Sequence, residues 1–291
     1  MTSIKTDSDL TKAEMKLVED LTGMASSQIS LNDLGWTSRV YVANDGQFIM
    51  KFPRKEAVKK EYAQEAKIYK LLEPLDLEVQ VPKLRWVHPA YDYIGYEGIT
   101  GVEYDSVAET IDQAHQTAIG HSIGNFLKQL HQLQLDNPHI MTVEDEIKQF
   151  QAKYTACLPL LNSRITKDEQ ERYEKFIYHE MPAEIRRLGS KPVLCHGDLG
   201  YWNLVLKQDG QVGVIDFGDV GYYDESKDFG GLEDEAMLEA ALEVYGDGDM
   251  LRERIAIRRK SIPFLELQYY DEIGDTVKIQ ETLQTIRERL G

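Results

Sequence analysis

The chain has 291 residues, enough for one large domain or for two lobes with a buried core. It carries 50 acidic and 33 basic residues, for a formal net charge of -17. This charge argues against nucleic acid and against an anionic membrane surface as partners, and it suits a small cationic substrate better. The alternative interpretation is that the excess of acid only keeps the protein in solution.

The chain start and the cysteines indicate a cytoplasmic setting. The first 21 residues alternate charged and apolar side chains, without the basic start and apolar run of a secretion signal. No apolar stretch approaches the length of a membrane span. Cys157 and Cys195 are too few for a disulfide framework or a metal site, which favours a reducing cytosol. We therefore expect a cytoplasmic protein, and we also expect a monomer.

The first hundred residues predict a small sheet with two helices. Asn44-Asp45-Gly46 is a hairpin-turn signal between two β-rich runs. The predicted elements are a helix over 10–21, strands over 40–42 and 48–52, a helix from 55 to Pro74, and strands over 79–87 and 91–99. After the first helix, the predicted order is strand, strand, helix, strand, strand. This order is typical of the small lobe of protein kinases.

From residue 106 onward the pattern becomes helical. An apolar stripe at three-and-four spacing covers 119–133. Further helices are predicted near 144–157, 168–189, 231–245, 249–268 and 276–289. We therefore predict an α+β, two-lobed, protein-kinase-like fold. Its β-rich nucleotide-binding lobe spans 1–97, and its helical catalytic and substrate-binding lobe spans 98–291.

The chemistry is concentrated between residues 193 and 219. There Asp198 of the His-Gly-Asp triplet is followed by Asn203 and then by Asp216, which is the spacing of a kinase catalytic loop and its metal-binding aspartate. Phosphoryl transfer needs clamped phosphates, a placed metal and an aligned hydroxyl. Asp198 is the candidate that orients or accepts the proton of the hydroxyl, and Asn203 and Asp216 are candidate Mg²⁺ ligands, since Mg²⁺ prefers hard oxygen ligands.

A purely structural interpretation of these residues is also available. It makes the His-Gly-Asp triplet a turn, Asn203 an edge residue and Asp216 a capping residue. Each reading is reasonable alone, but the ordered combination favours a catalytic loop. We interpret His196 as a buried imidazole that braces the loop, and Cys195 as a small buried hydrophobic residue.

Lys51 is the candidate phosphate-positioning cation. Alternation in its strand places it on the face opposite Met50, and a lysine on an inner face needs an anionic partner. The following helix offers Glu61 and Glu65. We favour Glu65, because the helix pattern turns this glutamate toward the strand.

The loop before this strand is a candidate phosphate cover. Its backbone amides and the hydroxyls of Thr37 and Ser38 can donate hydrogen bonds to phosphates. The loop contains a single glycine, Gly35, rather than a Gly-x-Gly-x-x-Gly motif, so its prediction depends on its position ahead of Lys51.

Ten acidic residues and one basic residue lie between 222 and 250. A cleft lined by carboxylates concentrates a polyamine and orients its ammonium groups. The other interpretation is a solvated helix face. Glu233, Asp234 and Glu235 lie nearest to the catalytic stretch and are the candidate substrate contacts.

Taken together, several stretches resemble the aminoglycoside phosphotransferases of the antibiotic-kinase family over nearly the whole chain. They are HGDLGYWNLVL, VIDFGDVGYYDESKDF, IMKFPR with EYAQEAKIYKLL, and GYEGITG. GWTSR, FPR and GYEGITG look most similar to the branch that phosphorylates the 2″-hydroxyl. The resemblance implies ATP or GTP as the phosphate donor, with Mg²⁺. It also implies that Glu97 and Ile99 contact the purine edge through backbone atoms and that Tyr96 lines the pocket.

Two departures from protein kinases favour a small-molecule acceptor. Gly197 stands where those kinases have the arginine that senses a phosphorylated loop, and no Ala-Pro-Glu follows Asp216. We therefore predict an alcohol-acceptor phosphotransferase that acts on an aminoglycoside. The alternatives are a kinase of another small alcohol, such as a macrolide or a choline- or homoserine-like metabolite, and a non-catalytic nucleotide-binding module.

Overall fold

The computed structural model describes residues 7–33, 37–136, 138–246, 248 and 250–290. The chain divides into two compact units. Unit 1 consists of Met1–Phe126 and Tyr201–Val220, and unit 2 of Leu127–Gly200 and Gly221–Gly291. Unit 1 contains the predicted nucleotide-binding lobe and adds two later segments to it.

Unit 1 is a sheet-rich unit. Its helices are α1 (Asp7–Thr22), α2 (Val58–Leu72) and most of α3 (Gln113–Leu130), and its strands are β1 (Ile29–Asn32), β2 (Ser38–Ala43), β3 (Phe48–Pro53), β4 (Lys83–Val87), β5 (Ile94–Glu97), β6 (Val102–Glu103), β8 (Leu204–Leu206) and β9 (Val212–Val214).

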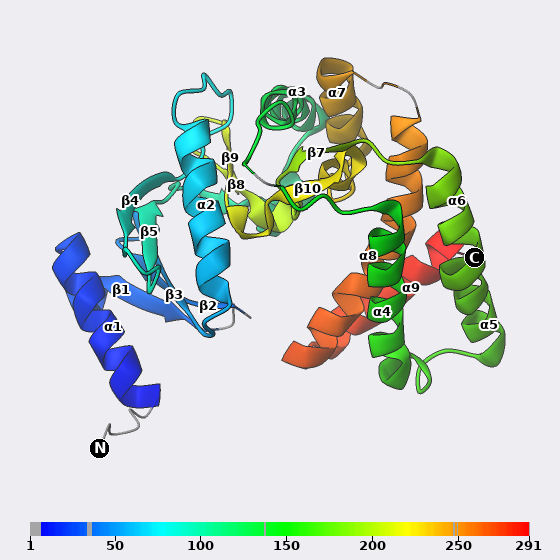
Figure 1. The fold of residues 1–291 in the computed structure, drawn as a ribbon, viewed down its shortest axis with the longest axis horizontal. Helices are drawn as coiled ribbons and strands as arrows, with labels where there is room; N and C mark the ends of the chain where they lie inside the picture. The colour runs from blue at the N-terminus through cyan, green and yellow to red at the C-terminus, as the bar shows by residue number, and fades with distance from the viewer. Residues whose placement is uncertain (1–6, 34–36, 137, 247, 249, 291) are drawn as a thin grey trace. The chain divides into compact units, whose positions relative to one another are not determined.

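The larger sheet of unit 1 has the order β1-β2-β3-β5-β4, with every pair antiparallel. Asn44 and Asp45 turn the chain from β2 to β3 with φ angles of 51° and 52°, a left-handed region that asparagine and aspartate tolerate. Helix α2, cyan in Figure 1, runs beside this sheet and packs against β4. Its buried face includes Tyr62 and Tyr69 and also one carboxylate, Glu65.

The second sheet of unit 1, β6-β8-β9, includes two strands from the second part of the catalytic stretch, the part that contains Asn203 and Asp216. Leu204 pairs with Val214, and beyond this pair the Ile215 N–H donates to the Asn203 carbonyl at 3.0 Å. The hairpin therefore brings Asn203 and the residue before Asp216 to the same end of the ladder, although 12 positions separate them in sequence.

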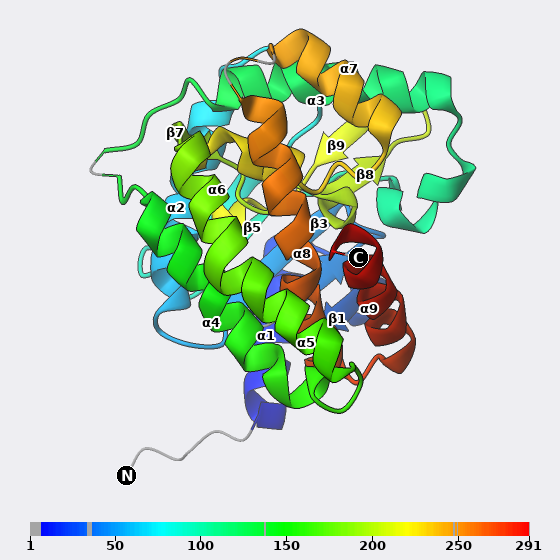
Figure 2. The same cartoon turned by 90° about the vertical axis from the view of Figure 1, so that its right-hand side faces the viewer.

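Unit 2 is mainly helical. It contains the end of α3, α4 (Val143–Leu161), α5 (Lys167–Lys175), α6 (Met181–Leu188), α7 (Glu235–Tyr245), α8 (Leu251–Ile273) and α9 (Thr276–Leu290), with the strands β7 (Pro192–Cys195) and β10 (Gly221–Asp224). Figure 2 shows α4, α6 and α8 side by side, and α9 packs against α8. Buried aromatic side chains such as Tyr154, Tyr173 and Phe264 fill their core. In the part of the chain that the structure describes, no helix is long and apolar enough to cross a membrane.

The predicted helix over 168–189 is interrupted in the structure. Helix α5 ends at Lys175, a π-helical turn follows at Phe176–Glu180, and α6 then begins at Met181. Pro182 has no N–H to donate to the preceding turn, so an unbroken α-helical ladder is impossible there. The predicted helix over 231–245 likewise begins later, at Glu235, because Asp234 caps its N-terminus.

Glu169 ties α5 to α9 and is expected to stabilise unit 2 in a pH-dependent way. Its carboxylate accepts hydrogen bonds from Arg287 Nε at 2.7 Å and from the Thr166 N–H at 2.7 Å. These bonds, that of Arg287 foremost, lower the pKa of Glu169 from 4.5 to about 2. The ionised form is thus favoured in the folded state, and its stabilisation is complete above the unfolded pKa and is lost as the pH falls from 4.5 toward about 2.

We expect Glu169→Gln to lower the free energy of unfolding by about 1 kcal/mol at neutral pH and by less near pH ~3, since the lost interactions are a helix cap and a partly exposed ion pair. Urea unfolding at the two pH values measures the difference. Glu171→Gln, an exposed residue of the same helix that pairs with the exposed Lys167, is the matched control. Equal losses in the two variants, or a loss for Glu169→Gln that does not change with pH, would contradict this role.

Candidate functional site

Unit 1 holds Lys51 between two carboxylates. Lys51 Nζ lies 3.1 Å from Glu65 Oε1 and 2.7 Å from Asp216 Oδ1. Lys51 is 7% exposed and Glu65 only 1%, whereas the Asp216 side chain is 52% exposed. The lysine therefore has one buried anionic partner that holds it in place and one accessible partner. Glu65, rather than Glu61, makes the contact.

Electrostatics keep Lys51 charged. Burial by itself disfavours the ammonium group, but Asp216 and Glu65 outweigh it and raise the pKa of Lys51 well above its ordinary value. Burial also raises the pKa of Glu65, against the opposing charge of Lys51. Glu65 thus depends on Lys51, because without the lysine its charge would lie unpaired in a buried site.

Asp216 and Asn203 offer the hard oxygen atoms that Mg²⁺ prefers. Asp216 has a left-handed backbone, with φ 61°, and its Oδ1 accepts a hydrogen bond from the Gly218 N–H at 3.4 Å. Residues other than glycine are uncommon in this region, although aspartate tolerates it, and they are often found at functional sites. Asn203 is 6% exposed. One accessible carboxylate and one buried amide fit a magnesium ion that keeps several of its waters.

The predicted purine-contacting segment begins in β5 and continues past its end. Tyr96 is 5% exposed, and its ring centroid lies 5.9 Å from Lys51 Nζ. Glu97 ends β5, and its carboxylate pairs with Arg85. Ile99 is buried against Gly213, where an added Cβ would come within 2.6 Å of the Ile99 side chain. Glycine at position 213 therefore permits this close contact.

The predicted phosphate cover is only partly described. Gly35 and Trp36 lie outside the described residues. Thr37 is exposed, and its carbonyl accepts from the Arg54 N–H at 2.8 Å. Ser38 is buried, and its hydroxyl accepts a hydrogen bond from the Tyr62 hydroxyl at 2.6 Å.

In unit 2 the catalytic loop follows β7, which pairs with β10. His196 is completely buried, and its Nδ1 accepts from the Asp198 N–H at 3.4 Å. Gly197 has φ 90°, a conformation that L side chains rarely adopt. The half-buried Asp198 follows this turn directly. The buried imidazole thus braces the loop as expected.

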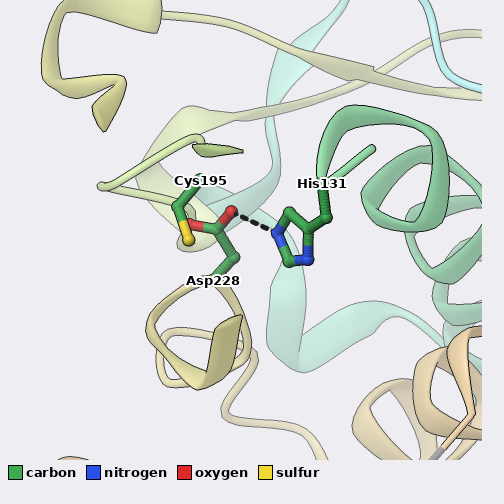
Figure 3. A group of neighbouring side chains, drawn as sticks. All are labelled: His131, Cys195 and Asp228. Atoms are coloured by element: carbon green, nitrogen blue, oxygen red, sulfur yellow. Dashed lines mark hydrogen bonds and ion pairs between the residues drawn. The ribbon is translucent and has the colours of Figure 1, made fainter. Parts of the chain in front are cut away.

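Sequence reasoning missed the residue that fixes this loop, Asp228. Its Oδ2 accepts from the His196 N–H at 2.7 Å and its Oδ1 from the Gly197 N–H at 2.9 Å. His131 Nε2 lies 3.0 Å from Asp228 Oδ2 (Figure 3). Burial opposes ionisation of the Asp228 carboxyl group. The hydrogen bond and charge of His131, together with the hydrogen bond from the Gly197 N–H, outweigh burial and lower the pKa of Asp228. The completely buried carboxylate is therefore ionised.

His131, Cys195 and Asp228 lie close enough together to suggest a metal site (Figure 3). The hydrogen bonds argue against one. The Cys195 thiol donates toward the Asp224 carbonyl at 3.5 Å, and burial raises its pKa well above the ordinary value, so it stays neutral. Both Asp228 oxygens already accept backbone N–H groups. The cluster is a hydrogen-bonded support for the catalytic loop.

The three predicted substrate contacts already have partners within unit 2. Glu233 lies 3.3 Å from Arg289, and Glu235 lies 3.8 Å from Arg259. Asp234 accepts from two N–H groups at the start of α7. Much of the acidic run is thus neutralised by arginines or used for capping.

Comparisons with known proteins show the family and the fold of the chain. The sequence model of a family described as "Phosphotransferase enzyme family" matches residues 28–254. Among solved structures, the GDP and kanamycin complex of an APH(2″) enzyme is 19% identical, with a TM-score of 0.72 over 96% of this chain and 98% of that chain. Macrolide 2′-phosphotransferase MphH from Brachybacterium faecium is 20% identical, with a TM-score of 0.62 over 93% and 95%. Choline kinase LicA from Streptococcus pneumoniae is 17% identical, with a TM-score of 0.62 over 96% and 99%. These likenesses confirm the predicted α+β, kinase-like fold.

Proposed function

Because this chain belongs to the phosphotransferase enzyme family, we propose that it transfers the γ-phosphate of ATP or GTP to a hydroxyl group of an aminoglycoside. The chain is an enzyme with an alcohol group as acceptor. The observation that carries the proposal is the position of Lys51 between the buried Glu65 and the accessible Asp216. This is the arrangement needed to hold a nucleotide phosphate beside a metal ligand.

On the donor side, Lys51 would bind the phosphates as a point charge, held in place by Glu65. Asp216 and Asn203 would hold Mg²⁺, which neutralises charge on the transferred phosphate when bound. Tyr96, with the backbone of Glu97 and Ile99, would bind the purine. Thr37 and Ser38 would cover the phosphates. Residues 1–97 would thus form most of the nucleotide-binding lobe.

On the acceptor side, Asp198 would orient the hydroxyl and take its proton as the hydroxyl oxygen bonds to the γ-phosphorus and the bond from that phosphorus to the departing nucleoside diphosphate breaks. The loop that carries Asp198 is well suited to this task, because buried Asp228 fixes its backbone through two N–H groups. A carboxylate whose backbone is fixed loses little freedom when the substrate binds.

An aminoglycoside of the 2″-hydroxyl branch is the acceptor that we favour. The net charge of -17 would attract a polycation, and several similar structures are 2″-phosphotransferases, one of them with gentamicin. Glu233, Asp234 and Glu235 would contribute to this attraction. We also propose that the enzyme works as a cytoplasmic monomer, without nucleic acid or membrane.

A second candidate is a kinase of another small alcohol, such as a macrolide or a choline- or homoserine-like metabolite. The specific observation in its favour is that Glu233 and Glu235 pair with arginines and that Asp234 caps a helix. These contacts leave fewer free carboxylates to bind the ammonium groups of a polyamine. An acceptor with a single amine requires fewer carboxylates for binding.

A coupled assay that crosses ATP and GTP with both acceptor classes tests the proposal. The panel contains several aminoglycosides, a macrolide, choline and homoserine, and release of nucleoside diphosphate is measured. We expect turnover with an aminoglycoside, and NMR of the product then locates the phosphate. Turnover with the macrolide, choline or homoserine alone would establish the second candidate. No turnover with any acceptor, despite nucleotide binding, would favour a non-catalytic module.

A further inference from the structure

Residues of α7 and α8, with one residue from the last turn of α9, form a cavity of about 360 Å³ in unit 2. Small-molecule sites in proteins usually have volumes of about 300 to 1,000 Å³, so this cavity can hold a ligand of modest size. The buried side chains of Leu238, Leu242 and Ile255 give it an apolar surface. Such a surface favours a ligand that has an apolar part.

The charged residues of the cavity are mostly cations. Four basic side chains and two carboxylates line it, namely Arg252, Arg259, Lys260 and Arg289 with Glu235 and Glu239. Three of the four basic residues come from the stretch 252–260, which holds five basic residues and one acidic residue in a chain with a net charge of -17. The charge of the cavity is therefore opposite in sign to that of the chain, and it suits an anion.

The other two basic residues of this stretch have a structural role. Arg254 and Arg258 are buried. Arg254 pairs with Glu225 at 2.5 Å, and Arg258 pairs with Glu146 at 2.6 Å. The interior of unit 2 thus uses two of the five cations for buried carboxylates, whereas the other three lie at the cavity, where a ligand can reach them.

Two arginines of the cavity are held in place by backbone carbonyls. The Arg259 guanidinium group donates to the Leu232 carbonyl, and Arg289 Nη1 donates to the Arg259 carbonyl at 2.6 Å. Arg259 Nη1 lies 3.8 Å from Glu235, whose side chain is 74% exposed. Arg289 Nη2 lies 3.3 Å from Glu233, whose side chain is 52% exposed. Exposed ion pairs of this kind contribute little to stability, so an anionic ligand can compete with them.

We propose that this cavity binds a small organic anion with an apolar body, such as a medium-chain carboxylate. The charged end contacts Arg259, Lys260 and Arg289, and the apolar part packs against Leu238 and Ile255. A guanidinium group binds a carboxylate through two parallel N–H donors, which fixes the direction in which the ligand enters. The proposal goes beyond the function proposed above and does not depend on the identity of the phosphate acceptor.

Titration of the unaltered protein with octanoate, followed by NMR of the backbone amides, tests the site. We expect saturable shifts that are largest in α7 and α8, at residues such as Leu238, Ala256 and Arg259. Octylammonium, which has the same chain length and the opposite charge, should bind about 10-fold more weakly or less, and so should inorganic phosphate, which has no apolar part. No saturable shift with octanoate, or equal binding of either comparison ion, would overturn the proposal.

The length of the ligand tests the apolar contact separately. From butanoate to octanoate, we expect the Kd to fall by about twofold to fourfold for each added CH₂ group, because each group is removed from water in the cavity. Equal affinity for butanoate and octanoate would contradict an apolar site.

Ala256→Glu tests the location of the site. Ala256 is exposed on α8 and lines the cavity, so the helix should tolerate the change while the new carboxylate repels the ligand. We expect the octanoate Kd to rise by about 10-fold or more. Ala152→Glu, which changes an exposed alanine of α4, is the matched control and should bind octanoate like the parent protein.

Lys260→Gln is a second variant that removes a cation at an exposed position without filling the cavity. It should raise the octanoate Kd by about threefold or more. Unfolding midpoints of all three variants show whether the fold is kept. Octanoate binding that is unchanged in Ala256→Glu or in Lys260→Gln would show that the ligand binds elsewhere, and would overturn the proposal.

Discussion

Asp198→Asn is expected to lower kcat by about 10²- to 10⁴-fold, because the amide cannot accept the proton of the attacking hydroxyl. Asparagine has nearly the same shape as aspartate, and the Asp198 backbone N–H keeps its bond to His196 Nδ1. The loop should therefore hold its conformation. Nucleotide affinity, which we assign to Lys51 and the metal ligands in unit 1, should stay close to that of the parent protein.

Three measurements check this expectation: kcat with the best acceptor, the nucleotide Kd by calorimetry, and the unfolding midpoint. Asp136→Asn, an exposed aspartate in unit 2, is the matched control and should be indistinguishable from the parent. A purified Asp198→Asn variant that keeps full turnover would reject Asp198 as the proton acceptor. A loss of both turnover and nucleotide binding would point to a damaged fold instead.

Lys51→Met should weaken both catalysis and stability, for two separable reasons. It removes the cation that we assign to the phosphates, and it leaves buried Glu65 without its partner 3.1 Å away. An uncompensated buried charge costs about 3 kcal/mol or more. Burial already raises the pKa of Glu65, so part of this cost is relieved by protonation of Glu65. We expect kcat/KM for the nucleotide to fall by about 10²-fold or more.

The double variant Lys51→Met/Glu65→Gln separates the two effects. With no buried charge left at the pair, stability should recover by most of the amount that Lys51→Met loses. Catalysis should not recover, because the phosphate-binding cation is still absent. Chemical unfolding and nucleotide kinetics on the same preparations give both readings. Recovery of kcat/KM in the double variant would show that Lys51 acts only through stability.

The Lys51–Glu65 contact could be predicted because it depends on local periodicity. Strand alternation fixes the face of Lys51, and helical spacing turns Glu65 toward it. The bond from Lys51 to Asp216 spans 165 positions, and its distance and the exposure of its carboxylate follow from how β3 and the β8–β9 hairpin pack. Sequence order indicates such a site, but it carries no information on which carboxylate stays accessible.

Asp228 shows where residue counting misleads. In sequence it is one of ten acidic residues in a charged run, which suggests a solvated or substrate-facing carboxylate. In the structure it is completely buried beneath the catalytic loop. One signal was present, since His131 lies four positions after Leu127 and directly after the last residue of α3, where a polar side chain is buried and needs a partner. Pairing it with a residue 97 positions later required the tertiary fold.

Unit 1 is built from two segments that are separated in sequence, which has a consequence for the order of folding. Its segment Tyr201–Val220 is synthesised only after the Leu127–Gly200 segment of unit 2. Until then β6 lacks its partner β8, and Lys51 lacks Asp216. An N-terminal fragment ending at Phe126 therefore cannot complete its second sheet or the lysine site that we propose for the phosphates, so we expect any stabilisation of unit 1 by nucleotide only late in synthesis.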